Sequence, residues 1–193
     1  MNLVPRLARL RREDGFTLTE MLVSSMLFSL VILVAGGIYL GMFSAQRQVS
    51  ALTSTASDAQ LAGTSIDTGL RNSSGFKLTS TANGQLLVAR VAGGATTVQW
   101  NCRAWYYSTS DHTIRTKTTT PGTPVTAPNA TQLATWTLLV DGVNARTGST
   151  IFTSAGKKVT VSFNATTDDN NRPVAISFSS TPLAGVTEST TCY

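Results

Sequence analysis

The sequence predicts an α+β protein in which one long amino-terminal helix, membrane-spanning in its first half, packs on a carboxy-terminal antiparallel β-sheet domain. Three features predict this fold class. Residues 21–43 are apolar and uncharged, apolar residues recur at helical spacing from 49 to 70, and apolar and polar residues alternate with period two after residue 74. The length of 193 residues suits one domain with an anchor.

The first half of the expected helix is the apolar run. As a helix, residues 21–43 would be about 35 Å long, enough to cross a hydrocarbon core of about 30 Å. Because basic flanks stay cytoplasmic, we expect a single-pass protein of the cell membrane whose carboxy-terminal domain lies outside. Arginines lie before the run at Arg6, Arg9, Arg11 and Arg12, and only Arg47 follows it closely.

The second half of the helix carries a narrow apolar stripe at alternating steps of three and four. Its members are Val49, Leu52, Ala56, Ala59, Gly63, Ile66 and Leu70. No proline occurs between Pro5 and Pro121, so we expect a helix from residue 16 to about 72 whose stripe covers a sheet. A free coiled coil is the weaker alternative, because small and β-branched residues occupy much of the stripe.

The remainder of the chain shows the pattern of strands separated by turns. The expected strands are 76–79, 85–91, 97–107, 113–117, 135–140, 158–163 and 174–179. Turns such as Asn83-Gly84 and Asp141-Gly142 favour antiparallel meanders in one sheet. Segment 118–131, rich in Thr and Pro, is expected to be an exposed loop, and 168–171 a hairpin tip rather than a calcium site.

The chain has two cysteines, Cys102 and Cys192. An even number in an exported chain predicts one disulfide. It would close a loop of about 90 residues, for which the chain-entropy model gives roughly 4–5 kcal/mol of stabilisation. Two unpaired buried thiols are the alternative.

The junction between the charged leader and the apolar run differs from an ordinary secretory signal, in which cleavage follows the apolar segment. Gly15 ends the charged part and Phe16 begins the apolar part, so cleavage between them would leave the helix on the mature protein. Glu20 supports this interpretation, because a carboxylate costs about 2.5–3.5 kcal/mol near the bilayer centre and should have a partner or a function. The new α-amino group of Phe16 would lie four positions away. An uncleaved signal anchor is the alternative.

Residues 15–22, Gly-Phe-Thr-Leu-Thr-Glu-Met-Leu, together with the apolar run resemble the class III signal motif of type IV prepilins and type II secretion pseudopilins. The strict resemblance covers residues 6–43. It implies that prepilin peptidase cleaves after Gly15, that Phe16 becomes an N-methylated first residue, and that Glu20 pairs with a neighbour's amine during assembly. It also divides the chain into a cleaved leader 1–15, a transmembrane and filament-core half of the helix 16–45, an amphipathic half 46–72 and an outer β-sheet domain 73–193.

The sequence offers no pattern of an active site. His112 is the only histidine, no Gly-x-Ser-x-Gly elbow marks a nucleophile, and no Cys/His cluster has zinc spacing. No phosphate-binding glycine loop occurs either. The aromatic group Trp100, Trp105, Tyr106 and Tyr107 suits core packing better than stacking on nucleic acid bases. We therefore expect no catalytic residue, no cofactor, no metal and no enzyme held by a signal anchor.

The resemblance implies a structural protein. We expect a minor pilin or minor pseudopilin, similar to the larger W- or J-type subunits, that is stored in the membrane before assembly. It would then join other pilin subunits in an extracellular or periplasmic filament, which could serve a pilus, type II secretion or competence.

A second hypothesis is that the outer domain binds DNA or another surface ligand for uptake or adhesion. The net charge of +5 falls when the arginine-rich leader is removed, and the remaining basic residues are scattered. Only folding could gather them into the basic stripe that DNA requires. These residues are Arg71, Lys77, Arg90, Arg103, Arg115, Lys117, Lys157 and Lys158.

Overall fold

The computed structural model describes residues 15–93, 98–120, 122–166, 172–183 and 192–193. By its internal contacts the chain divides into two units, Met1–Gln46 and Arg47–Tyr193. The first unit is helical in its described part, and the second contains all the described strands. Most of the expected leader and the expected hairpin tip at 168–171 lie outside the described residues.

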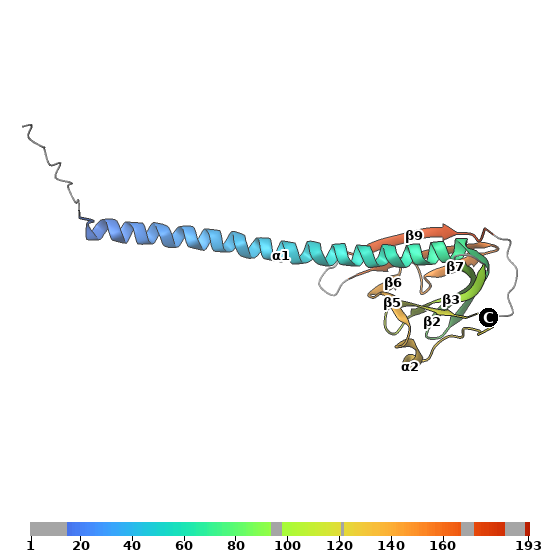
Figure 1. The fold of residues 1–193 in the computed structure, drawn as a ribbon. Helices are drawn as coiled ribbons and strands as arrows, with labels where there is room; N and C mark the ends of the chain where they lie inside the picture. Colours follow the sequence, from blue (N-terminus) through green and yellow to red (C-terminus); the bar gives the residue numbers. More distant parts are fainter. Residues whose placement is uncertain (1–14, 94–97, 121, 167–171, 184–191) are drawn as a thin grey trace, which may run out of the picture. The chain divides into compact units, whose positions relative to one another are not determined.

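Helix α1, Leu18–Arg71, contributes to both units (Figure 1). It begins after Thr17, whose main-chain oxygen and hydroxyl accept hydrogen bonds from the Glu20 N–H at 3.0 and 3.3 Å. In its last turn, Arg71 Nε donates to the carboxylate of Asp67 at 2.9 Å. The observed helix therefore confirms the predicted one to within two residues at either end.

The first sheet has five strands in the order β1-β2-β3-β4-β5, and each strand is antiparallel to its neighbours. The spatial order follows the chain order, so this sheet is the predicted meander. Its strands are β1 Ser73–Thr81, β2 Gly84–Gly93, β3 Gln99–Ser108, β4 Thr113–Thr119 and β5 Thr137–Val140.

The remaining strands form a second sheet, whereas the sequence pattern predicted a single one. Strand β8 is its centre: β9 pairs along one edge, and β7 and β6 pair in succession along the other. The chain changes sheets at Asp141-Gly142, where Gly142 has φ +61° and any Cβ would overlap the carbonyl oxygen of Thr166. The strands are β6 Val143–Ala145, β7 Phe152–Ala155, β8 Lys158–Ala165 and β9 Val174–Ser180.

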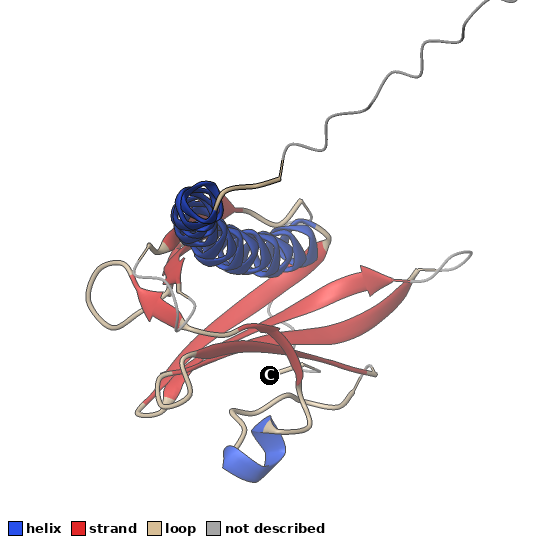
Figure 2. Cartoon of the chain, turned by 90° about the vertical axis from the view of Figure 1, so that its left-hand side faces the viewer, coloured by secondary structure: helices blue, strands red, loops and turns tan. Residues whose placement is uncertain are grey.

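Residues 47–71 of α1 cover one face of the strands and contact both sheets (Figure 2). Gly63 lies against Phe178 and Ile176 of β9, and Gly69 lies against the indole ring of Trp105 in β3. The large core on this face combines helix residues with apolar side chains of β2, β3, β4, β7 and β8.

The predicted helix stripe is confirmed over most of its length. Ala59, Gly63, Ile66 and Leu70 are buried, whereas Val49 at its start is 63% exposed. Among the aromatic residues of β3, Trp105 and Tyr107 belong to this core, and Tyr106 belongs to a second core on the opposite face. The alternation of β3 therefore buries Trp105, Tyr106 and Tyr107 on two faces, whereas Trp100 is only half-buried.

The second core lies on the outer face of the five-stranded sheet, away from α1 (Figure 2). The Thr/Pro-rich segment and the short helix α2, Ala130–Leu133, cover this face and bury Val125 and Leu133. The prediction of an exposed loop at 118–131 is confirmed for most of its described residues, but Val125 is buried and the segment covers the outer face. The reason is physical: β2 and β3 are apolar on both faces, so the outer face also needs a cover.

A buried glutamine joins the two sheets. Gln85 in β2 accepts hydrogen bonds through Oε1 from the N–H groups of Ile151 and Phe152 at 2.7 and 2.9 Å. Its Nε2 donates to the carbonyl oxygen of Phe152 at 3.0 Å and to Ser80 Oγ at 3.3 Å. The side chain thus acts as a strand partner for β7, which accounts for a polar residue that is only 3% exposed.

Candidate processing and assembly site

The predicted junction lies at the start of the described chain. Gly15 and Phe16 precede α1 without regular structure, and Phe16 is 73% exposed. Thr17 then caps the helix as described above, which places Glu20 in its first turn. The positive end of the helix dipole favours an acid at this position by roughly 0.3–1 kcal/mol at an exposed site.

Glu20 lies five residues after Gly15, the predicted cleavage point, and its carboxylate is unpaired in the described chain. Its carboxylate has no hydrogen bond or ion pair within the part of the chain that the structure describes. The pattern Thr17-x-x-Glu20 matches a capping box, yet only the Thr17 half of that motif forms. The acid is therefore available to a partner outside the described chain.

The apolar helix after Glu20 is exposed along residues 18–46. It is the one described helix long and apolar enough to cross a membrane, with a mean hydropathy of 2.3 over its best window. Two of its serines bond within the helix: Ser25 Oγ donates to the Leu22 oxygen at 2.9 Å and Ser29 Oγ to the Ser25 oxygen at 2.8 Å. This helix can therefore enter lipid, or a bundle of similar helices, with these two hydroxyls already paired.

The comparisons with known proteins bear on this same segment. Residues 10–36 match the family model of the prokaryotic N-terminal methylation motif. This amino-terminal segment is type IV prepilin-like. Comparisons with curated proteins and with solved structures give no match.

The prepilin-like motif supports the expectation of a pilin-like or pseudopilin-like subunit. It implies processing by prepilin peptidase and assembly with other pilins, and it marks a structural rather than a catalytic class of protein. The exposed apolar helix fits anchoring in a membrane followed by incorporation into a filament. The motif ends at residue 36, so the β-sheet domain is outside the match.

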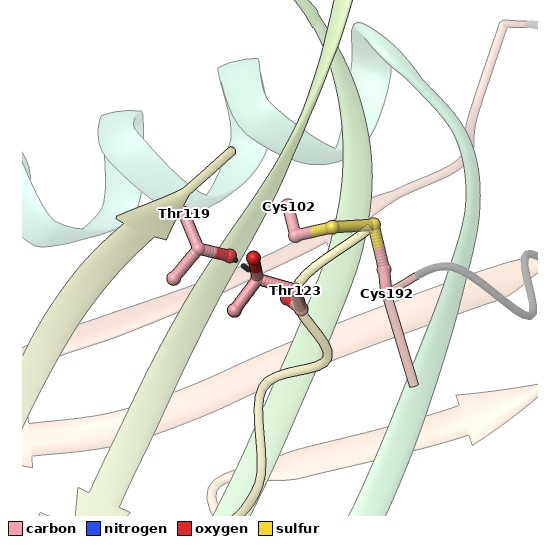
Figure 3. Close-up of a disulfide and its surroundings, with 4 residues drawn as sticks. All are labelled: Cys102, Thr119, Thr123 and Cys192. Atoms are coloured by element: carbon pink, nitrogen blue, oxygen red, sulfur yellow. Dashed lines mark hydrogen bonds between the residues drawn. A yellow bond between two sulfur atoms is a disulfide. The ribbon is translucent and has the colours of Figure 1, made fainter. Parts of the chain in front are cut away.

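The predicted disulfide between Cys102 and Cys192 is confirmed (Figure 3). It joins β3 to the last described segment, and both cysteines are buried in the outer core. Two hydrogen bonds hold the chain beside it: the Val125 N–H donates to the Cys192 oxygen at 3.0 Å, and Thr119 Oγ1 donates to the Thr123 oxygen at 3.1 Å. The crosslink therefore holds the cover of the outer face onto the sheet.

His112 has a structural environment. It lies in the turn between β3 and β4 with φ +53°, and its main-chain oxygen accepts the Val143 N–H at 2.7 Å. Its Nδ1 lies 3.2 Å from the Val143 oxygen, so ring and backbone together hold β6. Among the described residues, no group of three or more metal-ligating side chains comes together.

Folding gathers half of the scattered basic residues on the outer face of the five-stranded sheet. Their cross-strand partners, which include Val88, Ala104 and Tyr106, belong to the outer core, so the basic side chains share that face. None of the five strands contains an acidic residue. The four residues are Lys77, Arg90, Arg115 and Lys117.

The other basic residues lie elsewhere. Arg103 is on the helix side, where its Nη2 donates to Ser65 Oγ at 3.0 Å and its guanidinium lies 5.4 Å from the Trp105 ring centroid. Burial lowers the pKa of Arg103 from its ordinary value. Arg71 is paired with Asp67, and Lys157 and Lys158 lie at the turn between β7 and β8.

Two helix-capping motifs were not predicted, although the sequence contains the pattern of each. Thr17 and Glu20 have the spacing of a capping box, and so do Asn129 and Gln132 ahead of α2. In α2 both halves form: the Gln132 N–H donates to Asn129 Oδ1 at 2.8 Å, and the Asn129 N–H donates to Gln132 Oε1 at 3.1 Å. This box shapes a groove on the outer face.

Proposed function

We propose that this protein is a minor subunit of a type IV pilus or a related secretion or competence filament. The observation that carries the proposal is the methylation motif at residues 10–36, which coincides with an exposed apolar helix. The chain would be held in the cell membrane with its β-sheet domain outside, and would later leave it for a filament.

The proposed roles of the junction residues follow from their positions. Prepilin peptidase would cut between Gly15 and Phe16, release the leader 1–15 and leave an N-methylated amine on Phe16. The unpaired carboxylate of Glu20 would then meet the amine of a neighbouring subunit in an apolar surrounding, where an isolated charge is costly. This pairing would set the register of assembly.

Assembly would be driven by the helix surface. Large apolar side chains along the helix, such as Leu27, Ile32 and Tyr39, are more than half exposed. A bundle of such helices removes the same surface from water that lipid removes before assembly. The proposed helix boundaries, 16–45 for the filament core and 46–72 for the part on the sheets, follow this division.

The size of the outer domain supports a minor rather than a major subunit. A late Trp-Tyr-Tyr strand followed by a long Thr/Pro segment is similar to the layout of the larger W- or J-type subunits. The presence of Glu20 is unlike the tip subunit that typically lacks this acid. The exposed part would then occupy a small number of positions in each filament.

The test starts with the mass of the protein purified from cells that contain prepilin peptidase. We expect a chain that begins at Phe16 and carries one extra methyl group. We also expect Glu20→Gln to be processed normally but to fall by at least about tenfold in sheared filaments. Asp58→Asn, an equal charge change at an exposed residue of the same helix, should assemble normally. A chain that begins at Met1, or normal assembly of Glu20→Gln, would refute the proposal.

A second candidate function is capture of DNA by the outer domain, and the acid-free basic face of the first sheet favours it. Binding should weaken steeply with salt, because phosphate contacts release counterions. Lys77→Gln and Arg90→Gln should each reduce it, whereas Lys158→Gln at the β7–β8 turn should have little effect. Absence of binding at low salt would exclude this function.

A further inference from the structure

A groove of about 270 Å³ opens on the outer face of the second unit. It lies between β4, the Thr/Pro-rich segment and α2, and is open to solvent on one side. Its volume is near the lower end of small-molecule sites, roughly 300 Å³, so it suits a single ring. The residues that matter for its chemistry are Lys117, Val125, Thr126, Thr131, Gln132 and Trp136.

The walls of the groove are held by contacts that do not involve a ligand. The Val125 N–H is bonded to Cys192, and Cys192 is crosslinked to β3. On the opposite wall, the Asn129–Gln132 capping box begins α2, and the Trp136 oxygen accepts a hydrogen bond from Arg115 Nη1 at 3.2 Å. The groove is therefore preformed, which reduces the ordering cost of binding.

One positive charge faces the groove. Lys117 is the only charged residue among the described ones that line it, and its Nζ lies 5.9 Å from the centroid of the Trp136 ring. Lys117 forms no salt bridge with any described acidic residue. On the same face of β4, Arg115 adds a second cation, and its buried Nε has no hydrogen-bond partner among the described residues. The groove therefore favours an anion.

Neutral polar groups surround that charge. The hydroxyls of Thr126 and Thr131 are exposed and make no hydrogen bond within the described chain. Gln132 Oε1 is occupied by the Asn129 N–H, which leaves the amide NH₂ of Gln132 as a donor. Val125 and two prolines supply apolar surface. The lining thus combines a cation, hydroxyls, an amide and small apolar patches.

We propose that this groove binds one acidic sugar residue, such as a uronic acid at the end or branch of a polysaccharide. The carboxylate would pair with Lys117, the ring hydroxyls with Thr126, Thr131 and Gln132, and the C–H face with the exposed ring of Pro124. A nucleic acid base fits less well, because stacking needs an open aromatic face and Trp136 is only 4% exposed. This site goes beyond the filament role and does not depend on it.

The test uses the full chain in mild detergent and saturation-transfer NMR, which detects weak ligands. The probes are the methyl glycosides of glucuronic acid, galacturonic acid and sialic acid, with methyl glucoside and inorganic phosphate as comparisons. At least one acidic glycoside should bind with a Kd of about 10 mM or lower. Methyl glucoside and phosphate should bind at least about tenfold more weakly.

Matched variants separate the groove from the general charge of the face. Lys117→Gln should weaken binding of the acidic glycoside by about tenfold or more, and Thr131→Val should weaken it by a smaller factor. Lys77→Gln makes the same charge change on the same sheet face but outside the lining, and should leave binding unchanged. Unfolding midpoints of all three variants should match the unaltered protein, since these side chains are exposed.

Several outcomes would overturn the proposal. Failure of all three acidic glycosides to bind at about 10 mM would exclude an acidic sugar site. Equal binding of phosphate would reveal an anion site without sugar recognition. An equal loss of glycoside binding in Lys77→Gln and Lys117→Gln would show that binding depends on the overall charge of the sheet face and not on the groove.

Discussion

Gly69 and Gly63 lie in the same helix, and a methyl group should have opposite effects at the two positions. Both are buried residues of α1 in the second unit. At Gly69, a Cβ would lie 2.5 Å from Cζ2 of Trp105 and closer still to Cη2. At Gly63, it would lie 3.4 Å from Cε1 of Phe178 and 3.6 Å from Cγ2 of Ile176. The first distance is an overlap, and the second pair is ordinary contact.

The magnitudes follow from helix propensity and from how far the neighbours can yield. Replacing glycine by alanine inside a helix stabilises it by about 0.5–1 kcal/mol. Gly63→Ala should keep this gain. For Gly69→Ala the ring must move by roughly 1 Å to restore normal carbon contacts. Trp105 is fully buried and its Nε1–H donates to Ser65 Oγ at 3.1 Å, so overpacking should cost about 1–3 kcal/mol and exceed the gain.

Thermal unfolding of the full chain in detergent, followed by tryptophan fluorescence, measures the difference. For a domain of this size each 1 kcal/mol shifts Tm by roughly 2–4 °C, so the overpacking cost should make Gly69→Ala melt about 2–12 °C below Gly63→Ala. In a Trp105→Phe background, where the smaller ring leaves space, Gly69→Ala should no longer destabilise. Equal Tm values for the two alanine variants, or an unrelieved loss in Trp105→Phe, would refute the reasoning.

Three further predictions concern the second unit. Replacing both Cys102 and Cys192 by serine should lower the free energy of unfolding by about 4–5 kcal/mol in the chain-entropy model; dithiothreitol should lower the urea midpoint of the unaltered chain and leave that of the variant unchanged. Gln85→Leu should destabilise by about 2–5 kcal/mol, because the N–H groups of Ile151 and Phe152 lose their acceptor; hydrogen exchange at these two amides should accelerate, and an unchanged exchange rate would contradict the role of the glutamine. Burial raises the pKa of Tyr107 above its ordinary value of 10.0, so the unfolded chain releases this proton first and stability falls as the pH rises above that value. Tyr107→Phe should therefore flatten the fall in unfolding midpoints between about pH 9 and 11. An equally steep fall in the variant would contradict this role of Tyr107.

The sequence predicted the helix and most strands because their patterns are long. Helix α1 carries an uncharged run and a stripe that repeats over several turns, and β8 alternates burial at every residue. Strands β6 and β7 were not predicted because they span only three and four residues, and β7 buries only Phe152. A period of two cannot be recognised from one buried residue. Their place is set by pairing with β8, which is a long-range contact.

The covering role of the Thr/Pro-rich segment was not predicted, although the sequence contains a signal for it. Residues 86–89 of β2 are all apolar and all buried, which is the pattern of a strand covered on both faces. The helix covers only one of these two faces. Taken together, the two-sided strand and the buried Val125 show that the Thr/Pro-rich segment is the second cover. The groove could not be predicted, because it needs this cover, β4 and the disulfide in place.

The two parts of the protein depend on different kinds of sequence information, and this separates their responses to mutation. In the proposed role the residues of the junction would act as a linear signal, because Phe16 is 73% exposed and the Glu20 carboxylate forms no hydrogen bond or ion pair with the described chain. The stability of the second unit rests instead on distant pairs, such as Gly69 with Trp105 and Gln85 with Phe152. Glu20→Gln should therefore leave the Tm of the second unit unchanged, while Gly69→Ala should lower that Tm and leave cleavage after Gly15 intact. A loss of cleavage in Gly69→Ala at a temperature where the domain is folded would show that the signal is not read independently of the fold.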